Sequence, residues 1–168
     1  MSHPVVLALF GEADAAAAAA RNLRAFGVPR ERVSIVARSH DEEGVVARAA
    51  GASPGSEIED SGPASRLGEL SAHLIAAIAL VMPGIGPIVA DGPLAAGLGE
   101  AAGHLAGGIA RTLESAGLPR SDAEQWESRI HAGAFLVGAH VQEHQVAGAR
   151  EALAGAGGSH VLVGTWPD

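Results

Sequence analysis

Residues 4–10 read PVVLALF, a short apolar run that predicts a buried β-strand. The next segment, Glu12–Phe26, is rich in alanine, carries apolar residues at helical spacing near its end, and stops before Gly27, a residue type that often ends helices. Arg32–Arg38 (RVSIVAR) then predicts a second strand. The first 39 residues are therefore expected to form a β-α-β unit.

The C-terminal part of the chain repeats this pattern. Phe135–Val141 predicts a strand, Glu143–Ala154 a helix and His160–Trp166 a final strand, and an amphipathic helix is expected before them over Ser121–Ala132. Two such halves predict an α+β fold, namely a ferredoxin-like, four-stranded antiparallel sheet with two helices on one face.

An insertion separates the two halves. Residues 40–64 are rich in Gly, Ser, Pro and acidic residues and predict a loop. Residues 65–117 predict an apolar helical hairpin, with helices at about Ser65–Met82 and Pro93–Ala116. The expected organisation is one compact domain: a first half at 1–39, the loop, the hairpin, and a helix with the second half at 118–168.

Residues 83–87 (PGIGP), followed by GPLAA at 92–96, mark the middle of this insertion. With the early Val-x-Ala-x-Phe strand (residues 6–10) and the late Gly-x-x-Val-x-Val strand (158–163), this pattern resembles small bacterial general-stress and low-temperature-induced proteins of unknown function. The resemblance covers nearly the whole chain. It implies the fold and a stress setting. It provides no enzymatic activity to carry over, and it gives no support for a metal site.

Charge and composition exclude several classes of function. The net charge is −8 and no basic cluster with aromatic residues occurs, so a nucleic-acid partner is not expected. The absence of cysteine excludes disulfides, thiolate metal sites and cysteine catalysis. The N-terminus lacks a signal-peptide pattern, which favours a cytoplasmic location. The uncharged stretch Leu74–Ala90 is divided by Pro83 and Gly84, so a membrane-spanning hairpin is not expected either.

The main candidate site consists of two Glu-x-x-x-His pairs within the apolar insertion. Glu69 and His73 form one pair, and Glu100 and His104 form the other. A spacing of four residues brings two side chains to one face of a helix. Carboxylate and imidazole ligands suit iron, manganese and zinc, and ionisable groups in apolar surroundings are costly unless they are paired or metal-bound.

Several arrangements of such a site remain open. Counting from a hairpin centre near Ile88 puts His73 and His104 at about the same level along the two helices, so the two histidines can share one metal. Alternatively, each helix can hold its own metal through its own Glu/His pair. A homodimer that packs two hairpins together would gather four Glu and four His, which resembles a di-iron bundle, although such bundles use Glu-x-x-His. In a second alternative, which needs no metal, both pairs lie on partly exposed polar faces of amphipathic helices. Haem ligated by the two histidines is a third alternative, disfavoured by the shortage of aromatic and basic residues.

One further motif needs separate treatment. Residues 140–144 (HVQEH) match a zinc-protease string, H-x-x-E-H, that requires one continuous helix. Here His140 ends a predicted strand and the helix begins near Glu143, so the match is interpreted as coincidence. His3, His40, His131 and His160 stand alone in the sequence and are interpreted as surface or strand-end residues.

The sequence therefore favours a metal-binding bacterial protein with non-haem iron or manganese, or else zinc, acting in metal sequestration or oxidative-stress chemistry. The alternative is a non-catalytic, stress-associated module whose hairpin serves oligomerisation or membrane contact. In either case the apolar hairpin predicts a homodimer or larger oligomer.

Overall fold

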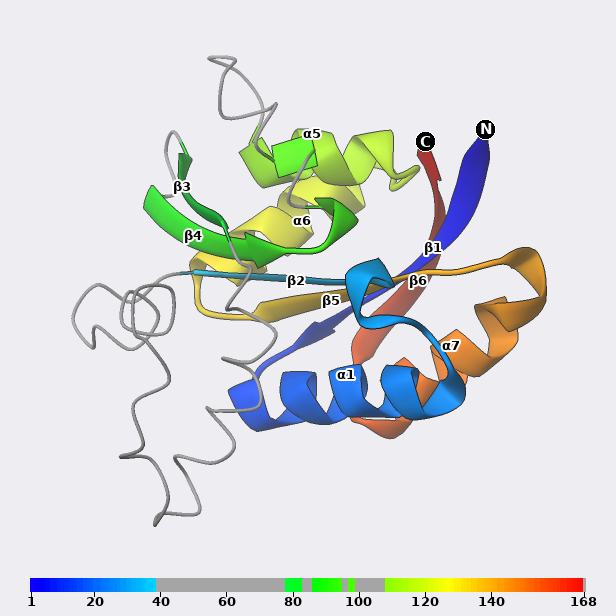
Figure 1. Ribbon diagram of the computed structural model, residues 1–168. Helices are drawn as coiled ribbons and strands as arrows, with labels where there is room; N and C mark the ends of the chain where they lie inside the picture. The colour runs from blue at the N-terminus through cyan, green and yellow to red at the C-terminus, as the bar shows by residue number, and fades with distance from the viewer. Residues whose placement is uncertain (39–77, 83–85, 95–96, 99–107, 168) are drawn as a thin grey trace, which may run out of the picture.

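The computed structural model describes residues 1–38, 78–82, 86–94, 97–98 and 108–167, and for 78–82 and 86–91 it describes the backbone alone. These residues form an α+β fold built on one antiparallel sheet (Figure 1). The elements in chain order are β1 (Ser2–Phe10), α1 (Ala13–Phe26), the 3-10 turn η1 (Arg30–Arg32), β2 (Val33–Arg38), β3 (Ile78–Met82), β4 (Gly86–Asp91), α5 (Gly108–Ser115), α6 (Arg120–His131), β5 (Phe135–His140), the 3-10 turn η2 (Glu143–Gln145), α7 (Val146–Gly155) and β6 (Ser159–Pro167).

The strands are arranged in the order β3-β4-β2-β5-β1-β6, and every neighbouring pair is antiparallel. Strand β1 lies between β5 and β6, with Val5 opposite His140 and Phe10 opposite Phe135. Six consecutive residues of β1, 5–10, are buried. A strand covered on both faces has no solvent side, which explains why this part of the sequence is apolar at every position.

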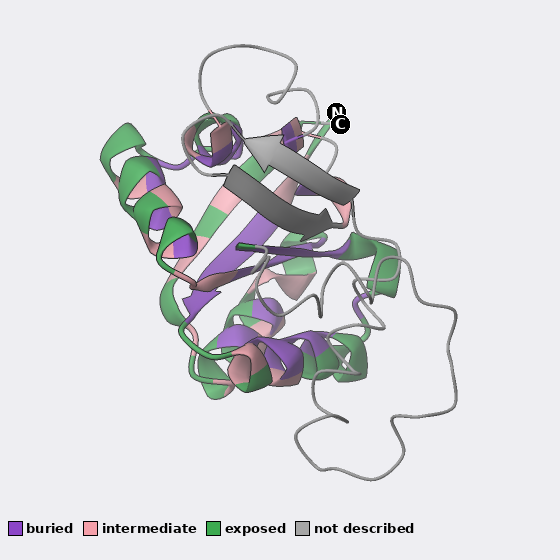
Figure 2. Ribbon diagram, turned by 90° about the vertical axis from the view of Figure 1, so that its left-hand side faces the viewer, coloured by how far each residue is buried: buried purple, intermediate pink, exposed green. Residues whose placement is uncertain are grey.

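Helices cover both faces of the sheet. Figure 1 shows α1 and α7 on one side and α5 and α6 on the other, and Figure 2 shows the buried residues gathered on the strands and on the inward sides of the helices. On the α1/α7 side, small residues such as Ala16 and Ala20 bring α1 close to the sheet. The opposite side is filled by larger side chains from α5, α6 and the segment 92–98: Leu94, Leu98, Ile109, Leu113, Trp126 and Ile130.

The elements predicted for the two ends of the chain are confirmed within a few residues. Helix α1 ends where the sequence indicates, because Gly27 adopts a left-handed conformation with φ 106° and its N–H bonds back to the carbonyl oxygen of Arg24. The helix predicted to begin at Glu143 begins instead with the 3-10 turn η2 and continues as α7. The predicted loop 40–64 lies outside the described residues.

The predicted helix over 65–82 is wrong for residues 78–82, which form strand β3. This strand pairs with β4, and β4 pairs in turn with β2, with Ile78 opposite Ala90 and Ala90 opposite Val36. A short apolar run bounded by Pro and Gly fits a strand as well as a helix, and the unpaired edge of β2 decides between them. Because β3 and β4 are paired antiparallel strands, counting helical turns from Ile88 no longer aligns His73 with His104.

The second predicted helix, over 93–116, is also interrupted. Residues 93–94 and 97–98 are helical, but Gly108, the first residue of α5, has a positive φ of 21°. A residue with that φ does not continue a right-handed helix. Among the described residues of the later part of this prediction, 108–115 are helical, as α5.

None of the helices in the described ranges is both long and apolar enough to cross a membrane. The longest, α1, has 14 residues, whereas a bilayer-spanning helix needs about 20.

Candidate functional site

Three polar side chains meet on the α5/α6 side of the sheet, where the neighbouring strands β2, β5 and β1 lie side by side. His140 ends β5 and is only 1% exposed, and Ser34 in β2 has no exposed surface. Nε2 of His140 lies 3.0 Å from Oγ of Ser34, and Nδ1 of His140 lies 3.1 Å from Nε2 of His3 in β1. In the chain, Ser34 is 106 positions and His3 is 137 positions from His140, so it is the strand order that brings the three residues together.

The polar chain continues from Ser34 into the segment that follows β4. The backbone N–H of Leu94 donates to Oγ of Ser34 at 3.1 Å. Gly92 makes this approach possible, because a Cβ there would overlap the carbonyl oxygen of Val33 and lie 2.7 Å from Cα of Ser34. Ser34 therefore joins the sheet to the end of the β3–β4 insertion.

Trp166 closes the cluster from β6. Its indole ring meets the His140 ring edge-on, with centroids 5.5 Å apart and planes at 85°. A Cβ on Gly97 would lie 2.9 Å from Cη2 of Trp166, so a glycine at this position lets the backbone pack against the indole. Leu94 is thus bonded to Ser34, and Gly97 lies against the indole.

The hydrogen bonds of this cluster are satisfied when His140 is neutral. One ring nitrogen of a neutral imidazole donates and the other accepts, so His140 can bond Ser34 and His3 at once in either tautomer. Burial, followed by the charges of His3 and Arg32, lowers the pKa of His140 to about 3. A proton on this ring would be taken out of water, and no carboxylate among the described side chains compensates it.

The order Ser34–His140–His3 resembles the relay of a nucleophile, a base and an orienting group. Two observations favour a structural role. The hydroxyl of Ser34 is fully buried and already accepts the Leu94 N–H. In addition, a base whose pKa is about 3 is poorly matched to proton transfer near neutral pH. The cluster is best described as a neutral polar anchor inside an apolar layer.

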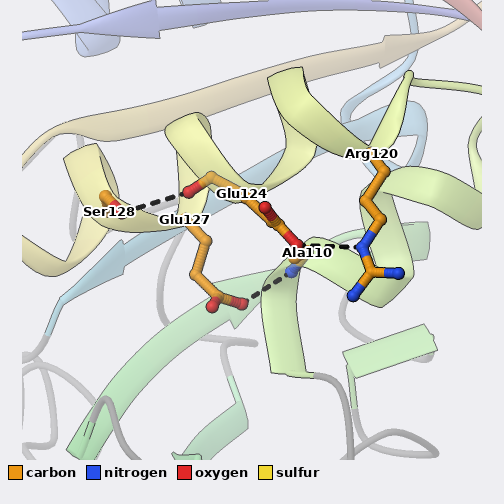
Figure 3. Close-up of polar contacts among 5 residues, drawn as sticks. All are labelled: Ala110, Arg120, Glu124, Glu127 and Ser128. Carbon is orange, nitrogen blue, oxygen red and sulfur yellow. Dashed lines mark hydrogen bonds and ion pairs between the residues drawn. The ribbon is translucent and has the colours of Figure 1, made fainter.

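A second anchor holds the start of α5. Figure 3 shows the Glu127 side chain of α6 reaching the backbone N–H of Ala110, with Oε2 and N 2.7 Å apart. The first N–H groups of a helix have no partner inside the helix, and a carboxylate there also meets the positive end of the helix dipole. Glu127 therefore caps α5 from a neighbouring helix.

Replacing Glu127 by alanine is expected to lower the free energy of unfolding by about 1 kcal/mol, because the loss of a helix cap typically costs that much. Glu124→Ala on the same helix is the matched control. Its carboxylate makes only a solvent-exposed ion pair with Arg120, at 2.9 Å (Figure 3). Urea denaturation of both variants checks the prediction, and an equal loss in the two would contradict the capping role.

The sequence-predicted ligands Glu69, His73, Glu100 and His104 lie outside the described residues. Within the ranges that are described, no three His, Asp or Glu side chains form a group suited to a metal ion. The interpretation of HVQEH as coincidence is confirmed, because His140 belongs to β5 and Glu143 to the turn η2. His3 lies near the start of β1, a strand-end position as predicted, but its ring also bonds His140, which the sequence did not indicate.

Sequence reasoning did not find the buried polar cluster. The available signal was a polar residue inside an apolar strand: Ser34 stands between Val33 and Ile35, and His140 follows Ala139. Comparison with protein-family models, curated proteins and solved structures found no match to this chain.

Proposed function

We propose that the protein binds a divalent transition metal through Glu69, His73, Glu100 and His104. Iron or manganese is favoured by the mixture of carboxylates and imidazoles, and zinc is an alternative. Metal sequestration or oxidative-stress chemistry is the role that such a site would serve.

One observation supports bringing the two Glu/His pairs together. Ile78 lies opposite Ala90, and Ala90 lies opposite Val36, so Ile78 is two strand spacings, about 10 Å, from Val36. Leu98 packs in the same core cluster as Val36. The chain that leads from His73 and the chain that leads to Glu100 therefore join the described domain close to each other.

The number of intervening residues limits how far the candidate ligands can be from these two points. His73 is five residues before Ile78 and Glu100 is two residues after Leu98. An extended chain spans at most about 3.6 Å per residue, so the Cα atoms of these two residues lie within about 18 Å and about 7 Å of the Cα atoms of Ile78 and Leu98. A site within one chain is compatible with these limits, as is a site shared between two copies.

Metal analysis tests this proposal. Protein purified without added chelator or affinity-column metal is expected to carry stoichiometric iron, manganese or zinc. The double variant His73→Ala/His104→Ala is expected to lose it. The matched control is His131→Ala/His144→Ala, which removes two exposed imidazoles elsewhere and should leave the metal content unchanged. Unchanged metal in the first double variant, or a metal-free wild-type protein, would refute the site.

A non-catalytic, stress-associated module is a second candidate. It is favoured by the described domain itself, in which both faces of the sheet are packed and the buried Ser34 and His140 bond each other. A metal-free protein whose stability and assembly survive Glu69→Ala and His73→Ala would support this alternative. An absorption spectrum would test haem bound by His73 and His104.

The ferredoxin-like assignment is a further part of the proposal. It is supported by the antiparallel order β2-β5-β1-β6. It is also supported by the two helices: α1 lies between β1 and β2 in the chain, α7 lies between β5 and β6, and both cover the same face of the sheet. A homo-oligomer and a cytoplasmic location remain predictions.

A further inference from the structure

The two edges of the sheet differ in how well they are protected. On one edge, β6 carries a bulge where its pairing with β1 shifts between Leu7 and Leu9, and His160 in this region has a positive φ of 54°. The N–H of Thr165 donates to the carbonyl oxygen of Ala116 at 2.8 Å, so the loop after α5 covers part of the same edge. Bulges and covering loops are the features by which proteins prevent edge-to-edge pairing.

The opposite edge, β3, shows none of these features in the described residues. Strand β3 reads IALVM, with no charge, no proline and no register shift against β4. In an antiparallel ladder alternate residues direct their N–H and C=O groups away from the strand they pair with. Within the described part of the chain no strand pairs with that outer side of β3.

We propose that β3 is an interaction surface for a second copy of this chain, which pairs through the same strand in antiparallel register. A twofold axis at Leu80 places Ile78 opposite Met82 of the second copy and Ala79 opposite its Val81. Residues that face each other across such a ladder lie on the same face of the sheet, and every facing pair in this register is apolar. The two sheets would then continue as one, and the interface would close without leaving a new free edge of the same kind.

Charge repulsion between two copies is weakest at this place. Each chain carries a net charge of −8, so two copies repel each other least where they meet through an uncharged surface. Residues 74–90 form a 17-residue stretch without any charged side chain, and β3 lies inside it. This inference does not depend on the metal site and goes beyond it.

The first test is sedimentation velocity on the full-length protein over a range of concentrations. Wild type is expected to form dimers. Leu80→Lys puts two like charges on the twofold axis and is expected to raise the dimer dissociation constant by about tenfold or more. Val163→Lys is the matched control, because Val163 is a 46% exposed valine on the opposite edge and its replacement should leave the assembly unchanged.

A charge-pair experiment tests the register of the two strands, and it remains informative if Leu80→Lys fails to fold. Ala79→Lys/Val81→Lys and Ala79→Glu/Val81→Glu should each be monomeric alone, and their equimolar mixture should form a heterodimer. A monomeric wild type at every concentration would overturn the proposal, since the edge would then be covered within one chain. A dimer that survives Leu80→Lys, or a mixture that stays monomeric, would overturn it as well.

Discussion

Lowering the pH from about 7.5 to about 4.5 is expected to reduce the free energy of unfolding by about 3 kcal/mol through His140 alone. The pKa of this imidazole falls from 6.5 to about 3 on folding, chiefly because the ring is buried. Below pH 6.5 the unfolded chain therefore binds a proton that the folded chain excludes. The stabilisation is complete above pH 6.5 and is lost progressively towards pH 3, by about 1.4 kcal/mol for each pH unit.

Urea denaturation of wild type and His140→Gln at several pH values measures this effect. An amide can still bond Ser34 but does not titrate, so the variant should be less stable near neutral pH and should lose less stability as the pH falls. The difference between the two slopes removes the contribution of every titrating group that does not contact His140. NMR of the imidazole nitrogens should find His140 neutral in the folded protein at pH 4.5.

His131→Gln is the matched control for this experiment. His131 lies in the last turn of α6 with an exposed side chain, so it meets water in both the folded and the unfolded chain. Its replacement removes an imidazole without disturbing the buried cluster, so the loss of stability attributed to His140 should persist. If His140→Gln leaves the dependence unchanged, the buried neutral imidazole is not the cause.

Much of the fold could be predicted because the two ends of the chain carry strong local signals. The runs at 5–10 and 135–139 are apolar at every position, whereas an edge strand needs apolar residues on one face alone. Both runs form central strands that are buried between helices. Gly27 supplies the left-handed conformation that ends α1. Local pattern and tertiary environment agree in these segments, which makes the prediction reliable.

The insertion was mispredicted where the deciding interaction is distant in sequence. Ile78–Met82 has too few residues to show a helical or a strand period clearly. Its conformation follows from pairing with β4 and, through β4, with the edge of β2 some 40 residues earlier. Nothing within the run itself encodes that partner.

The polar cluster escaped prediction for the same reason. His3, Ser34, His140 and the Leu94 amide come from four separate parts of the chain and share no motif. The motif that does include His140, HVQEH, was interpreted as coincidence and gave no indication of these partners. The Glu/His pairs remain a prediction, since they lie outside the described residues.

Replacing Gly92 by alanine is expected to cost about 3 kcal/mol or more of unfolding free energy, from two separate effects. Gly92 has a φ of 80°, a conformation that costs an L-residue about 1–2 kcal/mol. In addition, the new Cβ would overlap the carbonyl oxygen of Val33 and lie 2.7 Å from Cα of Ser34. Backbone atoms of a buried strand cannot move aside as a flexible side chain does. The turn must therefore separate from β2, which breaks the bond from the Leu94 N–H to Ser34.

Gly133→Ala separates the two effects, because Gly133 has a φ of 110° but no atom within 4 Å of the added Cβ. It should cost only the conformational penalty of about 1–2 kcal/mol. Gly92→Ala should also admit water to the His140 ring and raise its pKa toward the ordinary value of 6.5, which an NMR titration measures and which Gly133→Ala should not reproduce. Equal losses of stability in the two variants, with the His140 titration unchanged in both, would show that the segment after β4 is not held against Ser34. The pH dependence and the glycine substitution thus test one physical claim, that a neutral imidazole and a close backbone contact together fix the end of the insertion to the sheet.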